Sequence, residues 1–443
     1  MKKFIYLILL FHSVNIYSQN EQELKAFTLK FLNDIKNENF ESAYLNFDST
    51  ITKQFTLQQL KEVWTQIKSQ FGELKNINEP QISKMTGSTL FIYPLEFEKG
   101  ALNAQVAVDY FNKITGFFLT VRPESITYNI PDYADTSKIE EIYTSFGSPE
   151  YELDAILTKP KNKSNLPVVI LVHGSGPHDK DETIGPNKPF KDLALGLATN
   201  DIAVFRYDKR THSYGWKIRP DSIDLYLEVI EDVIYATNYL KEKSNDYGIS
   251  AQNIIVLGHS LGGSLIPRID KNSKDIKAYI SMAGMTRTVD QALIEQVFYI
   301  YNLDGVFDDK EKKDFEELKR KLLNALSQNL TLETPPDSLP MNLHPFYWLD
   351  FRSLYTFKEA ENLKKPILVL QGESDYQVTM EDFEGWKTAL KNNKNAQFKS
   401  YPKLNHLFMF SQFEKSSPQE YYRNGHISKE VILDIANWIK SLK

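Results

Sequence analysis

A serine stands between two glycines in the stretch "VLGHSLGG", residues 256–263. Its core, "GHSLG", fits G-x-S-x-G, a pattern in which a strand turns sharply into a helix and carries the serine at the apex. A side chain at Gly258 or Gly262 would collide with that turn. The turn would expose the Ser260 hydroxyl as a nucleophile and aim the backbone N–H of Leu261 at the oxygen of an attacked carbonyl. An inert serine in a tight turn is the alternative.

A serine nucleophile needs a histidine base and a carboxylate that orients the base, and in this pattern the carboxylate comes first along the chain. Asp375 follows the apolar run "ILVLQG", and His406 follows "FKSYPKLN", so both stand at the ends of predicted strands. A neutral His406 could take the serine proton while Asp375 fixes its tautomer. Two alternatives remain: Glu373 as the carboxylate, and His426, in front of the last predicted helix, as the base.

A second oxyanion donor is expected from the stretch "VILVHGSGPHD", residues 169–179, at the end of an earlier strand. A histidine, a glycine and a small flexible turn at such a strand end fit the second donor loop of serine hydrolases. We predict that the backbone N–H of Ser175 is the donor, with Gly174 as the alternative. His173 stands inside the strand end, which favours a buried, hydrogen-bonded structural role.

Composition narrows the chemistry further. The chain has 443 residues, no cysteine and a formal net charge of −6. The lack of cysteine excludes a cysteine nucleophile, a thiolate metal site and disulfides. The negative charge argues against a nucleic-acid or anionic-membrane surface. No His or carboxylate cluster has zinc-site spacing and no glycine-rich loop has phosphate-loop spacing, so we expect neither a metal nor a cofactor.

The first residues resemble a secretory signal. Two lysines precede an apolar run from Phe4 to Phe11, and a small residue follows at Ser18. This pattern predicts a signal peptide over residues 1–19 and an exported protein, periplasmic or secreted. A buried first helix is the alternative. No other stretch reaches the roughly 18 apolar residues that a membrane-spanning helix needs.

Two different patterns divide the rest of the chain. Residues 20–125 contain two amphipathic helical stretches followed by three strand-like runs, which predicts a small α+β domain. From residue 135 to 443, strands and helices alternate after a leading antiparallel pair, and the central strand "LPVVILV" is apolar throughout. A parallel sheet covered on both faces produces such a run, so we predict a doubly wound α/β domain.

One segment interrupts this alternation. Between the predicted strands "AYISM" and "ILVLQG" lies an insert at about 285–362, charge-rich and helical at first and aromatic at its end. An insert above strand ends is a common position for a lid, and a peripheral helical elaboration is the alternative. We expect Phe346, Tyr347, Trp348 and Phe351 to supply an apolar acyl or aryl pocket.

A charged cluster follows another strand. The stretch "FRYDKRTHSYG" places Arg206, Asp208, Lys209 and Arg210 together. These residues could bind an anionic part of a substrate. We favour an internal set of salt bridges that shapes the rim of the site.

From about residue 139 to its end the chain resembles the α/β-hydrolase superfamily. The stretches "HGSGPHDKDETIGPNKPFKDLA", "VFRYDKRT", "GHSLGG" and "GESDYQV" resemble bacterial exported esterases near the dienelactone hydrolase and acyl-peptidase groups. Those proteins often carry an N-terminal DUF3887-type domain, similar to nuclear-transport-factor-2-like folds, and residues 22–123 resemble that domain. The resemblance implies Ser260, Asp375 and His406 as nucleophile, acid and base.

These observations predict a serine hydrolase that cleaves carboxylic esters of small molecules through an acyl-enzyme intermediate. A serine peptidase of the acyl-peptidase type is the first alternative. The N-terminal unit is too short for the propeller that such peptidases usually carry. A non-enzymatic binding protein on a hydrolase fold is the second alternative. The sequence indicates neither the natural substrate nor the oligomeric state.

Overall fold

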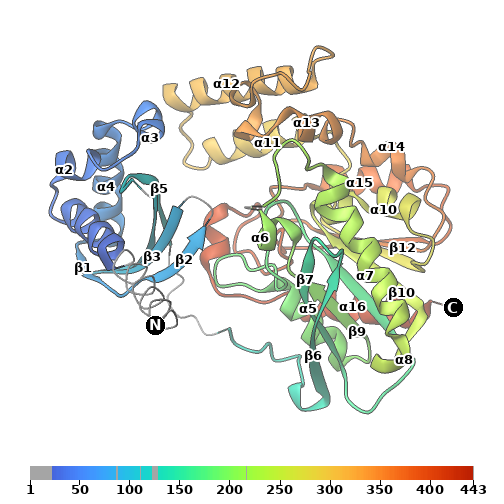
Figure 1. The fold of residues 1–443 in the computed structure, drawn as a ribbon. Helices are drawn as coiled ribbons and strands as arrows, with labels where there is room; N and C mark the ends of the chain where they lie inside the picture. The colour runs from blue at the N-terminus through green and yellow to red at the C-terminus, as the bar shows by residue number, and fades with distance from the viewer. Residues whose placement is uncertain (1–21, 86–87, 110, 122–127, 216, 443) are drawn as a thin grey trace, which may run out of the picture. The chain divides into compact units, whose positions relative to one another are not determined.

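The computed structural model describes residues 22–85, 88–109, 111–121, 128–215 and 217–442. Its chain divides into two compact units, residues 1–127 and 128–443, which are described separately below (Figure 1). The predicted signal peptide lies outside the described residues. Within the described ranges, no helix is both long and apolar enough to cross a membrane.

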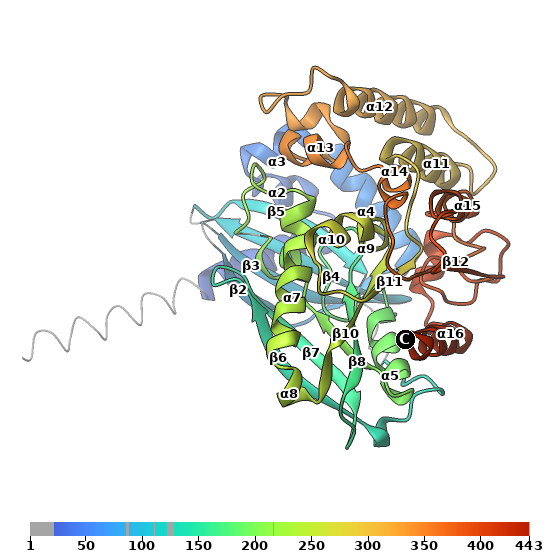
Figure 2. The same ribbon diagram turned by 90° about the vertical axis from the view of Figure 1, so that its right-hand side faces the viewer.

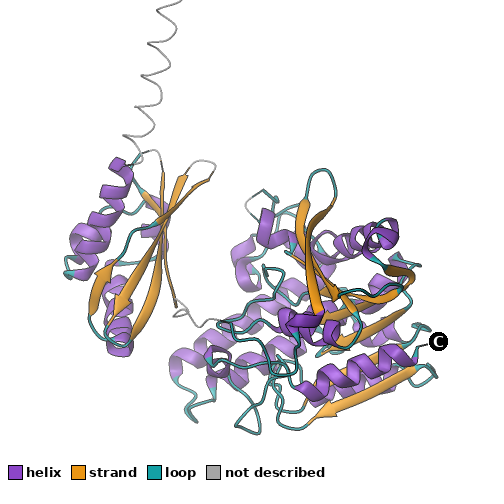
Figure 3. Cartoon of the chain, turned by 90° about the horizontal axis from the view of Figure 1, so that it is seen from below, coloured by secondary structure: helices purple, strands orange, loops and turns teal. Residues whose placement is uncertain are grey.

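The first unit packs helices on an antiparallel sheet (Figure 3). Its helices cover residues 22–36, α2 Phe40–Tyr44, α3 Ser49–Gln54 and α4 Leu57–Phe71. Its strands are β1 Leu74–Ile77, β2 Gln81–Met85, β3 Ser88–Phe97, β4 Gly100–Asp109 and β5 Ile114–Val121. The strand order is β1-β3-β4-β5, with β2 paired to β3. The two amphipathic stretches expected from the sequence correspond to the helix at 22–36 and α4, and the three strand-like runs to β3, β4 and β5. The short helices α2 and α3 and the short strands β1 and β2 were not expected.

The second unit contains one eight-stranded sheet of order β13-β12-β11-β10-β8-β9-β7-β6. Its strands are β6 Ile139–Gly147, β7 Glu152–Pro160, β8 Leu166–Val172, β9 Ala203–Tyr207, β10 Ile249–His259, β11 Ala278–Met282, β12 Ile367–Gly372 and β13 Ala396–Tyr401. Strands β6 and β7 pair antiparallel, and β7 pairs antiparallel with β9. The pairs from β9 to β13 are parallel. This order, with the small α+β unit in front, confirms the predicted fold class.

Two apolar cores lie on opposite faces of this sheet, because successive side chains of a strand point to opposite faces. In β10, Ile254 and Val256 belong to one core, while Ile255 and Leu257 belong to the other. The first core packs against α7 Glu231–Glu242, α10 Ile266–Asn272 and α15 Met380–Ala389. The second core packs against α5 Pro189–Thr199 and α16 Lys429–Ser441, which lie side by side (Figure 2). The central strands are therefore apolar on both faces.

The residues between β11 and β12, 283–366, are called the insert from here on. They form α11 Val289–Tyr301, α12 Asp309–Leu326, α13 Pro345–Phe351 and α14 Thr356–Ala360, with two short helical turns between α12 and α13. A capping box begins α11 at Thr288 and Gln291, and another begins α12 at Asp308 and Glu311. The insert is thus an ordered helical layer, anchored by local hydrogen bonds.

Candidate active site

Ser260 occupies a sharp turn between β10 and α9 Leu261–Ser264. Its φ is 51° and its ψ is −114°, a conformation that side chains rarely adopt. A Cβ on Gly258 would lie 2.3 Å from the backbone of Gly262, and a Cβ on Gly262 would lie 2.4 Å from the carbonyl oxygen of Val172. Both glycines are therefore required by the turn that presents the serine.

The structure brings His406 and Asp375 together. Nδ1 of His406 lies 2.6 Å from Oδ2 of Asp375, and both side chains are buried. The other carboxylate oxygen of Asp375 accepts backbone N–H groups from Gln377 and Val378, at 2.8 and 3.1 Å. These bonds fix the carboxylate, which in turn orients the imidazole. The alternative carboxylate, Glu373, is exposed and bonds to Ser400.

The alternative base, His426, lies elsewhere. Its Nδ1 is 3.0 Å from Oδ1 of Asp192, a residue of α5, and its ring contacts Tyr128 edge-on. It does not line the cavity that Ser260 and His406 share. The pKa of His426 is raised, chiefly by its hydrogen bond to Asp192. This pair joins the start of the last helix to α5 and has a structural role.

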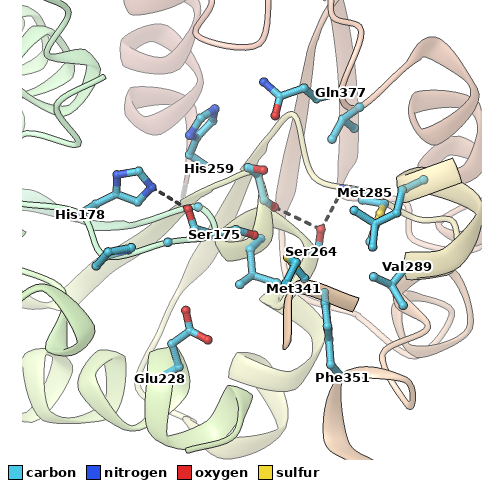
Figure 4. Close-up of a pocket in the computed structure, with 18 of the residues that line it drawn as sticks. Ser175, His178, Glu228, His259, Ser264, Met285, Val289, Met341, Phe351 and Gln377 are labelled. Carbon is cyan, nitrogen blue, oxygen red and sulfur yellow. Dashed lines mark hydrogen bonds between the residues drawn. The ribbon is translucent and has the colours of Figure 1, made fainter. Parts of the chain in front are cut away.

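Ser260, His406, Ser175 and Leu261 all line one cavity of about 810 Å³. Figure 4 shows this cavity, with Ser175 labelled. The insert supplies one wall, with Met285, Val289 and Phe351 opposite Ser175 and His178 in the figure. The hydrogen bonds among the described residues do not include one from the Ser260 hydroxyl to His406. In hydrolases without substrate this contact is often long and tightens when substrate binds.

The backbone N–H of Gly174 is already occupied. It donates to Oε1 of Glu182 at 2.8 Å. The N–H groups of Ser175 and Leu261 donate no hydrogen bond within the described part of the chain. Of the two predicted donors in this loop, Ser175 is therefore free to bind an oxyanion, and Gly174 is not.

Sequence reasoning missed the partner of His259. Its Nδ1 lies 3.0 Å from Oε2 of Glu182, and its Nε2 lies 2.9 Å from the backbone carbonyl of His406. Because both ring nitrogens face acceptors, the doubly protonated imidazolium fits this place. Burial alone would lower the pKa of His259, but the carboxylate of Glu182 outweighs burial and raises it. Burial would raise the pKa of Glu182, and the His259 cation outweighs it and lowers that pKa.

His173 has the structural role that its position in the strand predicts. It is buried, and its Nε2 donates to the carbonyl oxygen of Asp179 at 3.0 Å. Burial lowers its pKa to about 3, so the ring is neutral at ordinary pH. It packs on Phe190 and Tyr207, with ring centroids 4.9 and 5.3 Å away.

The four aromatic residues predicted for the pocket separate into two pairs. Tyr347 and Phe351 line the cavity, because positions four apart share one face of a helix. Trp348 points away into the core, where it is fully buried and donates its indole N–H to the Pro340 carbonyl. Phe346 is half-buried and does not line the cavity. The run of aromatics in the sequence does not reveal this division; helical periodicity within α13 does.

The charged cluster forms internal salt bridges, as predicted. Arg206 pairs with Asp181 and Glu141 at 2.9 and 2.8 Å, and Arg210 pairs with Asp232. All four residues of the cluster, Arg206, Asp208, Lys209 and Arg210, are buried. None of them lines the cavity. Among the described residues, no group of three or more His, Cys, Asp or Glu could hold a metal ion.

Comparisons with known proteins agree with this architecture. The family model described as BD-FAE matches residues 153–390, and that of the dienelactone hydrolase family matches residues 345–440. The DUF3887 model, of unknown function, matches residues 29–117. The chain is 34% identical over 431 residues to esterase EstD of Thermotoga maritima, covering 97% of this chain and 98% of that protein.

Solved structures of esterases are also similar to parts of the chain. An esterase of Pyrococcus furiosus is 14% identical, with 69% of this chain and 92% of that chain covered and a TM-score of 0.44. Est1E from Butyrivibrio proteoclasticus is 19% identical, with 66% and 98% covered and a TM-score of 0.41.

Proposed function

This chain belongs to the BD-FAE family of α/β-hydrolases and is a carboxylic ester hydrolase, and we propose that it works through a Ser260 acyl-enzyme. The observation that carries the proposal is the arrangement of three side chains. Ser260 stands at a strained turn, in one cavity with His406, and Nδ1 of His406 lies 2.6 Å from Asp375. A buried carboxylate, an imidazole and a hydroxyl in this order form the machinery of acyl transfer.

In the acylation step, the Ser260 hydroxyl attacks the ester carbonyl. Nδ1 of His406 faces Asp375, so Nε2 is the nitrogen that takes the serine proton. The carbonyl oxygen becomes an oxyanion and is held by the backbone N–H groups of Ser175 and Leu261. The tetrahedral intermediate collapses, and Nε2 returns the proton to the leaving alcohol. Water then takes the place of the alcohol and attacks the acyl-enzyme, while Nε2 accepts a proton from the water. Nε2 returns this proton to the Ser260 oxygen as the acid leaves.

The substrate that fits this cavity has an uncharged, apolar acyl or aryl group. Most of the side chains on its insert wall are apolar or aromatic: Met285, Val289, Leu293, Leu343, Tyr347 and Phe351. The carboxylates that line the cavity, Glu182 and Glu228, are already paired, with His259 and Lys209. A peptide substrate anchored by its amino group would need a free carboxylate. Ester cleavage is therefore favoured over the peptidase alternative.

A kinetic comparison tests this function. Purified protein without its first 19 residues should hydrolyse p-nitrophenyl esters and leave aminoacyl-nitroanilides uncleaved. Ser260→Ala should lower kcat by a factor of about 10⁴ or more, as removal of a triad member does. A Ser264→Ala variant is a matched control. Ser264 also lines the cavity, but its hydroxyl bonds only to backbone groups: it donates to the Ser260 carbonyl and accepts from the Met285 N–H. Full activity of Ser260→Ala would refute the proposal, and so would turnover of nitroanilides alone.

The protein is exported, periplasmic or secreted, in this proposal. The support is the N-terminal pattern of two lysines, an apolar run and a small residue at Ser18. Expression of the full chain in a bacterial host should yield a form that is shorter by about 19 residues outside the cytoplasm. The intact mass of that form measures the cleavage site. An uncleaved chain that stays in the cytoplasm would contradict export.

A further inference from the structure

Lys209 is buried beside the loop that carries the proposed oxyanion donor. Its ammonium donates to the carbonyl oxygen of Gly174 at 2.9 Å and to Oε1 of Glu228 at 2.5 Å. Its side chain is only 2% exposed. Gly174 and Ser175 line the cavity, whereas Lys209 does not. We propose that Lys209 is a positioning residue, which acts through the peptide between Gly174 and Ser175 to aim the Ser175 N–H at the oxyanion.

The planarity of the peptide bond carries this inference. The carbonyl of Gly174 and the N–H of Ser175 belong to one rigid unit, and in a trans peptide they point in opposite directions. Lys209, which does not line the cavity, holds the carbonyl on its own side of the peptide. The N–H of Ser175 then points away from Lys209, and Ser175 itself lines the cavity together with Ser260. The neighbouring N–H, that of Gly174, is held separately by Glu182 at 2.8 Å.

The charge of Lys209 adds to its geometric effect. A cation on a peptide carbonyl polarises the whole unit, and hydrogen bonds in a chain strengthen one another in a site of low dielectric constant. The N–H of Ser175 becomes a stronger donor when an oxyanion forms. A neutral side chain of the same length would lose both the hold on the carbonyl and this polarisation.

Two further residues fix the position of Lys209. Glu228 is buried and accepts from the ammonium with one oxygen and from the Tyr347 hydroxyl with the other, at 2.8 Å. Glu228 belongs to a π-helical turn, Tyr226–Ile230, a local irregularity that is frequent at functional sites. Tyr347 comes from the insert, and Glu228 lies below Ser175 in Figure 4. The insert and the oxyanion loop are thus joined through one buried ion pair.

This inference rests on the proposed function, and its test uses a ligand that forms a stable oxyanion on the active serine. A trifluoromethyl ketone adds to the active serine and places a negative oxygen where the ester oxyanion forms. In Lys209→Met, kcat on a p-nitrophenyl ester and affinity for the ketone should both fall by about 10–100-fold. This fall is no larger than the loss of kcat that follows the removal of one oxyanion donor. The KM for the ester should change by less than about twofold, because the ground state does not use the donor.

The variants separate positioning from simple loss of structure. Lys209→Met leaves Glu228 buried without its cation, so a second variant, Lys209→Met with Glu228→Gln, removes that charge as well. We expect it to regain thermal stability but not kcat. Lys180→Met is the matched control, because Lys180 makes a salt bridge to Asp208 in the same cluster and does not line the cavity. It should keep both kcat and ketone affinity.

Two different failures can be told apart. A folded Lys209→Met protein with unchanged kcat and ketone affinity, or with a raised KM alone, would overturn the positioning role and leave the Ser260 mechanism intact. A wild-type protein that the ketone does not inhibit, or a fully active Ser260→Ala variant, would overturn the proposed function itself.

Discussion

Glu182 and His259 form a buried ion pair next to Ser260, with Oε2 and Nδ1 3.0 Å apart. His259 is the residue before Ser260, and its Nε2 donates to the backbone of His406. The other oxygen of Glu182 holds the N–H of Gly174. One ion pair therefore connects the turn that carries Ser260, the loop that carries Gly174 and Ser175, and the loop that carries His406.

Glu182→Gln should make the stability of the protein less dependent on pH. The pKa of His259 is raised in the fold, so its contribution is present below about pH 6.5, its usual pKa, and is lost as pH rises through the raised value. The pKa of Glu182 is lowered, so its contribution is present above about pH 4.3 and is lost as pH falls toward the lowered value. The ion pair therefore stabilises the fold most between about pH 4.3 and pH 6.5.

Scanning calorimetry from pH 5 to 9 measures this effect. Near pH 5.5 the variant should lose about 3 kcal/mol of unfolding free energy, because removal of one partner of a buried pair is costly. The difference from wild type should shrink at alkaline pH. Glu373→Gln, at an exposed carboxylate, is the matched control, and its unfolding free energy should change with pH as that of wild type does. A difference that is constant with pH would show that the pair is not ionised.

Asp375→Asn should lower kcat by about 10⁴-fold with little change in KM. The amide can donate to Nδ1 of His406 and so favours the wrong tautomer, while the backbone bonds from Gln377 and Val378 keep the side chain in place. Steady-state kinetics on a p-nitrophenyl ester measures the loss. Asp192→Asn is the control, since it changes the carboxylate beside His426 in the same way. Equal losses in the two variants would contradict the assignment of His406.

Gly258→Ala should destabilise the hydrolase unit by about 3 kcal/mol or more, because overpacking costs most where backbone cannot move. The new Cβ would lie 2.3 Å from the backbone of Gly262. Gly425→Ala is the control, since its Cβ would meet only the flexible Met409 side chain, at 3.3 Å. Urea unfolding of both variants measures the difference. Similar midpoints would mean that the turn has more room than the structure shows.

Phe351→Ala should weaken the binding of longer acyl chains. Phe351 lines the cavity beside Tyr347, with ring centroids 5.5 Å apart. Lost apolar contact in such a pocket is worth about 1–3 kcal/mol, so kcat/KM for a long-chain ester should fall by about 10–100-fold while that for an acetate changes little. Phe346→Ala, on the same helix but off the cavity, should leave kcat/KM unchanged for both esters. A larger loss of long-chain activity in Phe346→Ala than in Phe351→Ala would place the acyl group elsewhere.

Much of the fold can be read from the sequence because its signals are local. Strand β8 is apolar throughout, as expected for a strand covered on both faces, and a Thr56–Gln59 capping box begins α4. The spacing of glycines about Ser260 predicts the turn, since backbone crowding there permits little else. These features depend on a few neighbouring residues.

Contacts between distant parts of the chain are not readable in this way. Nothing near Glu182 indicates that it reaches His259, and nothing near Lys209 indicates that it binds the Gly174 carbonyl. The aromatic run at 346–351 predicts a pocket, but only the helical geometry of α13 shows that Trp348 faces the core. Such pairings arise from the way loops meet at the carboxyl ends of the parallel strands.

The proposed mechanism requires Ser260 to become covalently modified during turnover. The most direct measurement is intact-mass spectrometry after reaction with a fluorophosphonate, followed by mapping of the modified peptide. We expect one added phosphonyl group, located on Ser260, in wild type and none in Ser260→Ala. A wild-type protein that stays unmodified while it hydrolyses esters, or a label on another residue that persists in Ser260→Ala, would contradict it.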